Sequence, residues 1–236
     1  MSLNIKNLSK SFGKLTVFKD FNLEIPEGQI TCILGPSGCG KTTLLNIIGG
    51  LEEPDSGELK GFESKVISYI FQEPRLIRWK TVWDNIDFVI KDSHSKEERN
   101  NLINKYLEIV GLADFKDYYP DRLSGGMMQR TAIARAFVYP ADLLIMDEPF
   151  KGLDLKLKIS VMDSFIKLWK ADKRTAVFVT HDIDEALYMG DEIYVLSSLP
   201  AQIRKEYFNQ VGREDRKFRD SRNFEAEGKF FELITS

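Results

Sequence analysis

Long hydrophobic runs are missing from this 236-residue sequence. No stretch approaches the roughly 18 consecutive apolar residues of a membrane-spanning helix, and the first residues lack the apolar stretch of a secretory signal. Cysteine is also scarce, with 2 residues in the chain. Cys39 lies among glycines, where a free thiol fits better than a disulfide. Together these absences indicate a reduced, cytosolic compartment.

A strong charge of either sign is missing as well. The chain carries 33 Lys and Arg against 36 Asp and Glu, a net charge of −3. This balance argues against a nucleic-acid binder, which normally presents a strongly basic face. With 43% hydrophobic residues the chain can bury a sizeable core, so disorder is excluded as its overall state. Its length is that of one or two domains.

The N-terminal part has the pattern of strands followed by a loop and a helix. Residues 3–34 alternate polar and apolar side chains, which predicts short, half-buried antiparallel strands, with 29–34 as an interior strand. From 41 to 48 the apolar residues take helical spacing. Strand, glycine loop and helix in this order form the unit that a phosphate-binding loop requires.

The remaining segments predict one α/β domain over residues 1–236 with a helical insert at about 75–138. Within the insert, Ser95 and Glu98 form a candidate capping box, and a further helix begins near Ser124. Short apolar runs at 143–146 and 175–180 then predict strands buried on both faces, as in a parallel sheet. A further strand is predicted at 192–196. A charge-dense tail from about 200 to 236 ends in a candidate docked helix.

Residues 35–42 match the pattern G-x-x-x-x-G-K-[ST] between a predicted strand and a predicted helix. Glycines let backbone N–H groups approach phosphate oxygens, and the helix N-terminus adds a favourable partial charge. The lysine would neutralise the β- and γ-phosphates, and the threonine hydroxyl would bind Mg²⁺. We therefore predict a nucleoside triphosphate site rather than a structural glycine turn. Its residues are Gly35, Pro36, Ser37, Gly38, Cys39, Gly40, Lys41, Thr42 and Thr43.

Two carboxylates, Asp147 and Glu148, follow the apolar strand at 143–146. Asp147 is placed to reach a Mg²⁺ ion, and Glu148 to hold and polarise a water that attacks the γ-phosphate. Alone, the pair would be read as a surface turn before Pro149. With the phosphate loop in the same chain, a metal ligand and a catalytic base are the better interpretation, and they favour hydrolysis over transfer.

Residues 123–130 open with Leu-Ser-Gly-Gly at a predicted helix start. A hydroxyl and bare N–H groups at a helix N-terminus form a second anion site, although an ordinary N-cap would look the same in isolation. Two phosphate-recognising helix starts separated by a helical insert resemble the ATPase subunit of ATP-binding cassette (ABC) transporters, from about residue 3 to about 205.

The resemblance implies a fold with a P-loop NTPase parallel sheet, an N-terminal antiparallel β subdomain and an α-helical insert. It also implies ATP and Mg²⁺ as ligands, and hydrolysis between two copies packed head to tail. One copy of each motif favours an identical pair. No nucleic acid is expected as a partner.

The same resemblance implies roles for residues outside the phosphate loop. They are a serine and two glycines that bind the γ-phosphate held by the other copy, and a glutamine that senses Mg²⁺ and the attacking water. The others are a histidine that contacts the γ-phosphate, an aspartate that bridges the copies, and an aromatic side chain that stacks on adenine. In this chain the serine and the two glycines are Ser124, Gly125 and Gly126, and the glutamine is Gln72. The histidine is His181, the aspartate is Asp154, and the aromatic residue is Phe12.

Residues 71–85 resemble those of importers for nitrate, aliphatic sulfonates, taurine and related solutes. Arg78 stands where that branch has proline, and Lys151 where a small residue is usual. Aromatic and aliphatic side chains between 73 and 90 predict a groove for a permease helix, with Arg75 and Trp79 as coupling residues, or else packing of the insert. The resemblance implies a peripheral location on the cytoplasmic face, under a permease that works with an extracytoplasmic solute-binding protein.

Three other functions compete with import. An exporter or lipid-extraction ATPase of the same fold shares the chemistry, and only residues 71–85 argue against it. A DNA-repair or chromosome-maintenance ATPase needs long insertions that 236 residues cannot hold. A kinase with the same phosphate loop would have no use for the segment at Ser124 or for the Asp147–Glu148 pair.

Overall fold

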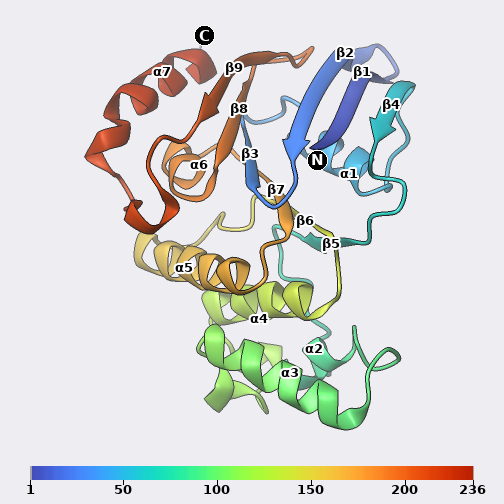
Figure 1. Ribbon diagram of the computed structural model, residues 1–236, viewed down its shortest axis with the longest axis vertical. Coiled ribbons are helices and arrows are strands. Elements are labelled where there is room, and N and C mark those ends of the chain that lie inside the picture. The colour runs from blue at the N-terminus through green and yellow to red at the C-terminus, as the bar shows by residue number, and fades with distance from the viewer. Residues whose placement is uncertain (1, 236) are drawn as a thin grey trace. The chain divides into compact units, whose positions relative to one another are not determined.

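The structure is a computed structural model that describes residues 2–235 (Figure 1). The described residues divide into two compact units. The first unit comprises residues 1–65, 145–148 and 175–236, and the second comprises 66–144 and 149–174. Across the described residues, every helix is too short or too polar to span a bilayer. The prediction of a single domain with a helical insert stays a prediction.

An antiparallel sheet occupies the N-terminal part of the first unit. Strand β1 (Ser2–Phe12) lies between β2 (Leu15–Pro26) and β4 (Ser56–Lys60). Ile5 pairs with Leu23 on one side and with Leu59 on the other. The predicted antiparallel strands are therefore confirmed, although β1 and β2 are long, at 11 and 12 residues.

A second, mainly parallel sheet forms the core of the first unit. Strand β3 (Ile30–Leu34) lies between the parallel strands β7 (Thr175–Thr180) and β8 (Glu192–Leu196). All residues of these strands are buried, which agrees with their continuous apolar sequences. Helices α1 (Lys41–Ile48) and α6 (Ile183–Met189) pack on this sheet. The predicted α/β fold is confirmed.

The C-terminal segment contains a strand that the sequence analysis did not predict. Strand β9 (Ile203–Phe208) pairs antiparallel with β8. Its sequence, Ile-Arg-Lys-Glu-Tyr-Phe, looks like part of a charged tail because it is largely exposed and lies at the edge of the sheet. The predicted terminal helix is confirmed as α7 (Phe224–Thr235). The short 3-10 helices η3 (Arg213–Asp215) and η4 (Ser221–Asn223) connect the two.

The second unit is mostly helical, as predicted for the insert. Helix α4 (Gly125–Val138) packs against three other helices, and its Phe137 meets Phe165 of α5 (Leu155–Ala171) edge to face at 5.3 Å between ring centroids. Both candidate N-cap serines, Ser95 and Ser124, cap helices, the first with a complete capping box to Glu98. The elements are β5 (Ile67–Ile70), α2 (Val82–Asp87), α3 (Lys96–Ile109), η1 (Ala113–Phe115), η2 (Pro120–Arg122), α4 (Gly125–Val138) and α5 (Leu155–Ala171).

Strand β6 (Leu143–Asp147) has its first two residues in the second unit and its last three in the first. In the first unit, therefore, Asp147 and Glu148 stand at the C-terminal end of a strand that neighbours β7. Because parallel strands present their C-terminal ends at one edge, this edge collects the polar side chains that follow β3, β6 and β7.

Candidate functional site

The loop between β3 and α1 has the backbone conformation that its glycines predict. Gly38 and Gly40 have φ angles of 81° and 98°, a left-handed conformation that residues with a side chain rarely adopt. At Gly40 a Cβ atom would also lie 2.4 Å from Cγ1 of Val17. The glycine at 40 is therefore required both by the turn of the loop and by the packing of β2 against it.

Lys41 begins helix α1 and is nearly fully buried. Its ammonium donates to the carbonyl oxygens of Gly35 at 2.7 Å and Pro36 at 2.8 Å. The side chain is thus folded back over the loop, with its charge held by neutral acceptors. Phosphate oxygens are stronger acceptors for an ammonium because both partners are then charged. The loop can therefore exchange these internal bonds for bonds to a polyphosphate.

Thr42 and Asp147 are brought together although they are far apart in sequence. The Thr42 hydroxyl donates to Oδ1 of Asp147 over 3.1 Å. Neighbouring ligands of an octahedral Mg²⁺ ion, each about 2.0–2.1 Å from the metal, stand about 3 Å apart. A hydroxyl and a carboxylate are oxygen ligands of the kind that Mg²⁺ prefers, so these two residues fit the predicted ion.

Glu148 and His181 form a pair at the same edge of the sheet. Nδ1 of His181 lies 3.1 Å from Oε1 of Glu148. Glu148 has a φ of 42°, in the left-handed region that is uncommon for residues other than glycine. Its amide donates to the carbonyl oxygen of Val179 at 3.1 Å. Such strained residues concentrate at functional sites, and this carboxylate is placed to accept a proton beside an imidazole.

A polar network that was not predicted from the sequence fixes the backbone on both sides of His181. The Thr180 hydroxyl donates to Oε2 of Glu185 at 2.6 Å and accepts from the amide of Asp182 at 3.0 Å. Asp182 in turn caps helix α6 by accepting from the amide of Glu185 at 3.2 Å. Thr180 and Glu185 are both almost fully buried. In the sequence, this network is indicated only by Glu185, an acidic residue in the first turn of α6, and α6 was itself not predicted.

Both cysteines are free, as predicted for Cys39, and both are buried. Burial raises the pKa of the Cys39 thiol, and the nearby Lys41 ammonium opposes that shift. Cys39 is therefore a neutral packing residue of the loop, and its thiol is not activated as a nucleophile.

Phe12 lies at the end of β1 with 48% of its surface exposed, so it is not the core aromatic that an N-terminal strand usually contributes. The ammonium of Lys10 lies 4.9 Å from its ring centroid and is held by Glu52 at 2.6 Å. The ring is thus presented to solvent with a cation beside it. This geometry leaves a ring surface on which a nucleobase can stack.

In the second unit, Ser124 and Asp154 each cap a helix. Ser124 caps α4 by accepting from the amide of Met127, and Asp154 caps α5 by accepting from the amide of Leu157. Leu157 also packs against Gly126, where a Cβ atom would lie 2.2 Å from Cδ1 of the leucine. The predicted γ-phosphate segment and the predicted bridging aspartate are therefore held together through Leu157, while Ser124 and Gly125 remain exposed.

Gln72 is exposed in the loop that follows β5. Next to it, the Arg75 guanidinium stacks on the Phe71 ring at 3.7 Å, and Arg135 donates to the Arg75 carbonyl oxygen at 3.1 Å. Trp79 is 80% exposed. The structure therefore describes the predicted residues in two groups. In the first unit it brings together Lys41, Thr42, Asp147, Glu148 and His181, and in the second it joins Ser124–Gly126 to Asp154.

Comparison with known proteins gives the family. Residues 18–151 match the ABC transporter family. The aliphatic sulfonates import ATP-binding protein SsuB of Bacillus cereus is 40% identical over 223 residues, which cover 89% of this chain and 87% of that protein. An uncharacterized ABC transporter ATP-binding protein of Methanocaldococcus jannaschii is 39% identical over 216 residues, covering 87% of this chain and 81% of the relative.

A solved bacterial ABC transporter cassette in dimeric form is also similar, with a TM-score of 0.75 and 32% identity over 89% of this chain and all of the other. Its post-hydrolysis dimer, bound to ADP and Pi, has a TM-score of 0.74 at the same identity and coverage. With this similarity over most of its length, and with a phosphate loop of the required geometry, the chain belongs to the ABC transporter family as an ATP-binding, ATP-hydrolysing cassette.

Proposed function

We propose that two copies of this ATPase pair head to tail and hydrolyse ATP to drive import of a small anion of the aliphatic sulfonate class through a separate permease. The observation that carries the proposal is the 40% identity to an aliphatic sulfonates import ATP-binding protein over 89% of the chain. The character of residues 71–85 supports the same branch, which also includes importers of nitrate and taurine.

On ATP binding, Lys41 releases the carbonyl oxygens of Gly35 and Pro36 and binds the β- and γ-phosphates. Residues 35–43 surround the phosphates with backbone N–H groups, and the positive end of the α1 dipole stabilises their charge. Phe12 stacks on the adenine.

Thr42 and Asp147 would hold Mg²⁺, and the 3.1 Å contact between them supports this arrangement. For Gln72 the role of sensing the ion and the attacking water rests on the family resemblance. When bound, the ion neutralises charge that develops on the β- and γ-phosphates during cleavage. Glu148 orients the attacking water and accepts its proton at the carboxylate. His181, 3.1 Å from that carboxylate, steadies it and contacts the γ-phosphate.

The site is completed by the other copy. Ser124 and Gly125 are exposed at the N-terminus of α4, a 14-residue helix whose dipole favours an anion there. In the pair they bind the γ-phosphate held by the partner's phosphate loop, and Asp154 bridges the two copies. The dimeric state of the solved cassette that is 32% identical supports this arrangement.

Uptake in cells tests the import proposal. Deleting the gene is expected to abolish uptake of radiolabelled ethanesulfonate while uptake of sulfate continues, with taurine and nitrate measured in parallel. The wild-type chain should restore uptake, and Glu148→Gln should not. Unchanged uptake of all these solutes, together with a loss of solute or lipid export, would replace import by the export function.

A further inference from the structure

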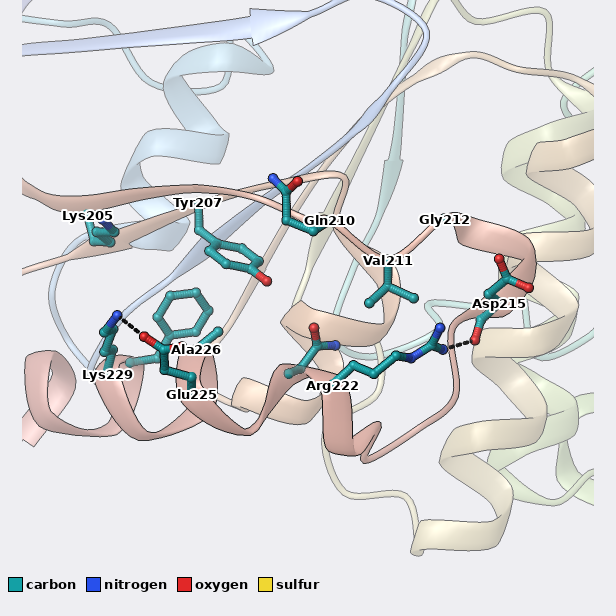
Figure 2. Close-up of a pocket in the computed structure, with 12 residues that line it drawn as sticks. Lys205, Tyr207, Gln210, Val211, Gly212, Asp215, Arg222, Glu225, Ala226 and Lys229 are labelled. Carbon is teal, nitrogen blue, oxygen red and sulfur yellow. Dashed lines mark hydrogen bonds and ion pairs between the residues drawn. The ribbon is translucent and has the colours of Figure 1, made fainter.

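The C-terminal segment lines an open cavity of about 670 Å³, outside the nucleotide site. Its walls come from β9, the turn after it and helix α7 (Figure 2). We call it the tail cavity. Small-molecule sites in proteins have volumes of about 300–1,000 Å³. The tail cavity is therefore large enough for a metabolite, and none of the residues assigned to ATP hydrolysis or to pairing of two copies lines it.

The middle of the tail cavity is apolar. Tyr207 and Phe230 meet edge to face, with ring centroids 5.4 Å apart. Phe230 is fully buried, and Val211 and Ala226 are each 8% exposed. Burial raises the pKa of Tyr207, so its phenol stays neutral. This surface can cover methylene groups, and a charge placed against it would lose its hydration without a partner.

Most charged groups that line the tail cavity are already paired. Lys229 lies 2.5 Å from Glu225, and Arg222 lies 2.6 Å from Asp220. The side-chain charges of two lining residues, Lys205 and Asp215, are not paired in this way. The Lys205 ammonium and the Asp215 carboxylate have no hydrogen bond or ion pair within residues 2–235. Arg222 donates to the backbone carbonyl oxygen of Asp215, and the Asp215 carboxylate attracts Arg222 only at longer range. Figure 2 shows them at opposite ends of the cavity, with Tyr207 and Ala226 between.

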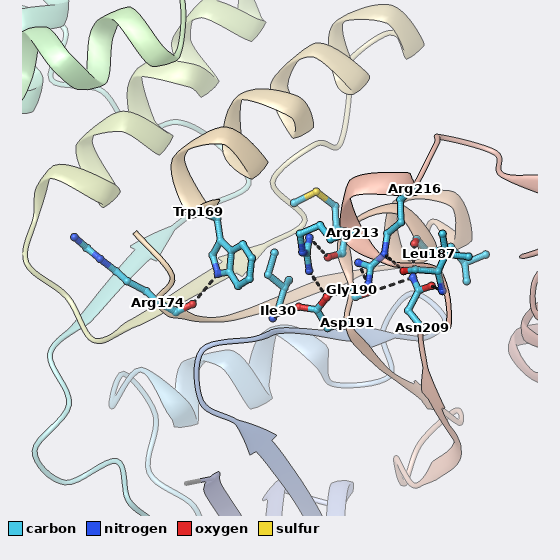
Figure 3. A network of polar contacts seen from close by, with 11 residues as sticks. Ile30, Trp169, Arg174, Leu187, Gly190, Asp191, Asn209, Arg213 and Arg216 are labelled. Carbon is cyan, nitrogen blue, oxygen red and sulfur yellow. Dashed lines mark hydrogen bonds and ion pairs between the residues drawn. The ribbon is translucent and has the colours of Figure 1, made fainter. Parts of the chain in front are cut away.

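The end of the cavity at Asp215 is held rigidly. Asp191 forms an ion pair with Arg213 at 2.5 Å, and it accepts hydrogen bonds from Arg216 at 3.0 Å and from the amide of Ile30 at 2.9 Å (Figure 3). Arg216 donates to the Val211 carbonyl oxygen at 2.9 Å. The residues around Asp215 are therefore tied to the start of β3. A site with fixed polar groups loses little conformational entropy when a ligand binds.

One buried polar atom also indicates a ligand. Asn223 lines the tail cavity and is 4% exposed, and its Oδ1 has no hydrogen-bond partner among the described residues. A buried acceptor without a donor is unfavourable, and nearly all such atoms in native proteins are satisfied. A ligand that carries N–H donors would relieve this.

We propose that the tail cavity binds a small linear zwitterion, whose anionic group meets Lys205 and whose ammonium meets Asp215. The methylene chain between the two charges lies on Tyr207 and Phe230. A simple carboxylate leaves the Asp215 end unmatched, and a simple amine leaves the Lys205 end unmatched, so both bind more weakly. This site goes beyond the ATPase function and does not depend on it.

Binding to the full chain without nucleotide tests the proposal, measured by calorimetry and by saturation-transfer NMR. The probes are ε-aminocaproate, caproate, hexylamine and hexanediol, which share one carbon chain and differ in their end groups. We expect ε-aminocaproate to bind about fivefold more tightly than caproate or hexylamine, the effect of one exposed ion pair. A series from γ-aminobutyrate to ω-aminooctanoate should show an optimum length.

Four variants locate the site. Lys205→Gln should remove the preference for ε-aminocaproate over hexylamine, and Asp215→Asn the preference over caproate. Arg204→Gln and Glu206→Gln are matched controls on the other face of β9, because side chains alternate along a strand. Neither control should change binding.

Exchange of the two charges gives the strictest test. Lys205→Glu combined with Asp215→Lys should bind ε-aminocaproate as well as the wild type, because the ligand can bind in the reverse direction. Equal affinity for all four probes, or binding that Lys205→Gln and Asp215→Asn leave unchanged, would overturn the proposal.

Discussion

Gly126 allows helices α4 and α5 to approach each other, because a Cβ at this position would lie 2.2 Å from Leu157. Alanine is favoured over glycine inside a helix by about 1 kcal/mol, but overpacking a core costs about 1–3 kcal/mol. Gly126→Ala should therefore lower the free energy of unfolding, measured by urea denaturation. Adding Leu157→Ala should restore part of the loss.

Gly228→Ala in α7 is the matched control, because no atom lies within 4 Å of a Cβ built there. This variant should be as stable as the wild type or slightly more stable. If Gly126→Ala proved equally harmless, the close packing of α4 on α5 would not hold.

Thr180 orients His181 by bonding on both sides of it, to Glu185 and to the amide of Asp182. Thr180→Val keeps the shape of the side chain and removes both hydrogen bonds. A catalytic group displaced by a fraction of an ångström lowers the rate more than it changes binding, so we expect kcat to fall about tenfold or more, with KM nearly unchanged.

Thr180→Ser keeps the hydroxyl and should retain most of the activity. A rise in KM at constant kcat for Thr180→Val would show that Thr180 serves nucleotide binding and not the position of His181. The steady-state ATPase assay separates the two results.

At the scale of elements, the segment that leads into α2 is well ordered but presents large side chains to solvent. The side-chain amide of Asn85 donates to the carbonyl oxygens of Ile77, Lys80 and Thr81. Trp79 in the same segment is 80% exposed. An ordered segment with an exposed aromatic side chain is a typical contact surface for another protein.

Trp79→Ala should therefore leave ATP hydrolysis by the isolated protein within about twofold of the wild type, since a single exposed side chain contributes little to stability. In cells it should uncouple transport, measured as loss of solute uptake. Phe224→Ala, another highly exposed aromatic residue, is the control and should transport normally. Normal uptake by the Trp79 variant would remove this segment from the permease contact.

At the scale of the whole molecule, the proposed head-to-tail pair predicts that hydrolysis and association are linked. Glu148→Gln keeps the size of the side chain but cannot accept a proton, so ATP should bind and persist. Turnover is expected to fall by about two orders of magnitude or more, as for the loss of a general base. Size-exclusion chromatography of this variant with ATP should show a dimer.

Ser124→Ala added to Glu148→Gln should weaken that dimer, because in the proposed pair the serine of one copy binds the nucleotide of the other. Glu206→Gln is the control for a neutralised carboxylate far from the site in sequence. Full ATPase activity by a strict monomer, indifferent to the loss of Ser124, would contradict the paired mechanism.

Much of the fold could be predicted because its signals are local. A buried strand, three glycines and an apolar helix repeat predicted the loop around Lys41, and a serine with a glutamate three residues later predicted the start of α3. Strand β9 was missed because a charged edge strand owes its conformation to pairing with β8 and not to its own residues.

Sequence alone determined the chemical groups available to this protein: which residues can bind phosphate, hold a cation or accept a proton. Their spacing within single loops carries that information, because backbone conformation there depends on the glycines themselves. Only the tertiary structure decided which groups meet. The contacts of Thr42 with Asp147 and of Glu148 with His181 join residues at or beyond the C-terminal ends of separate strands. They exist because parallel strands end at one edge of the sheet.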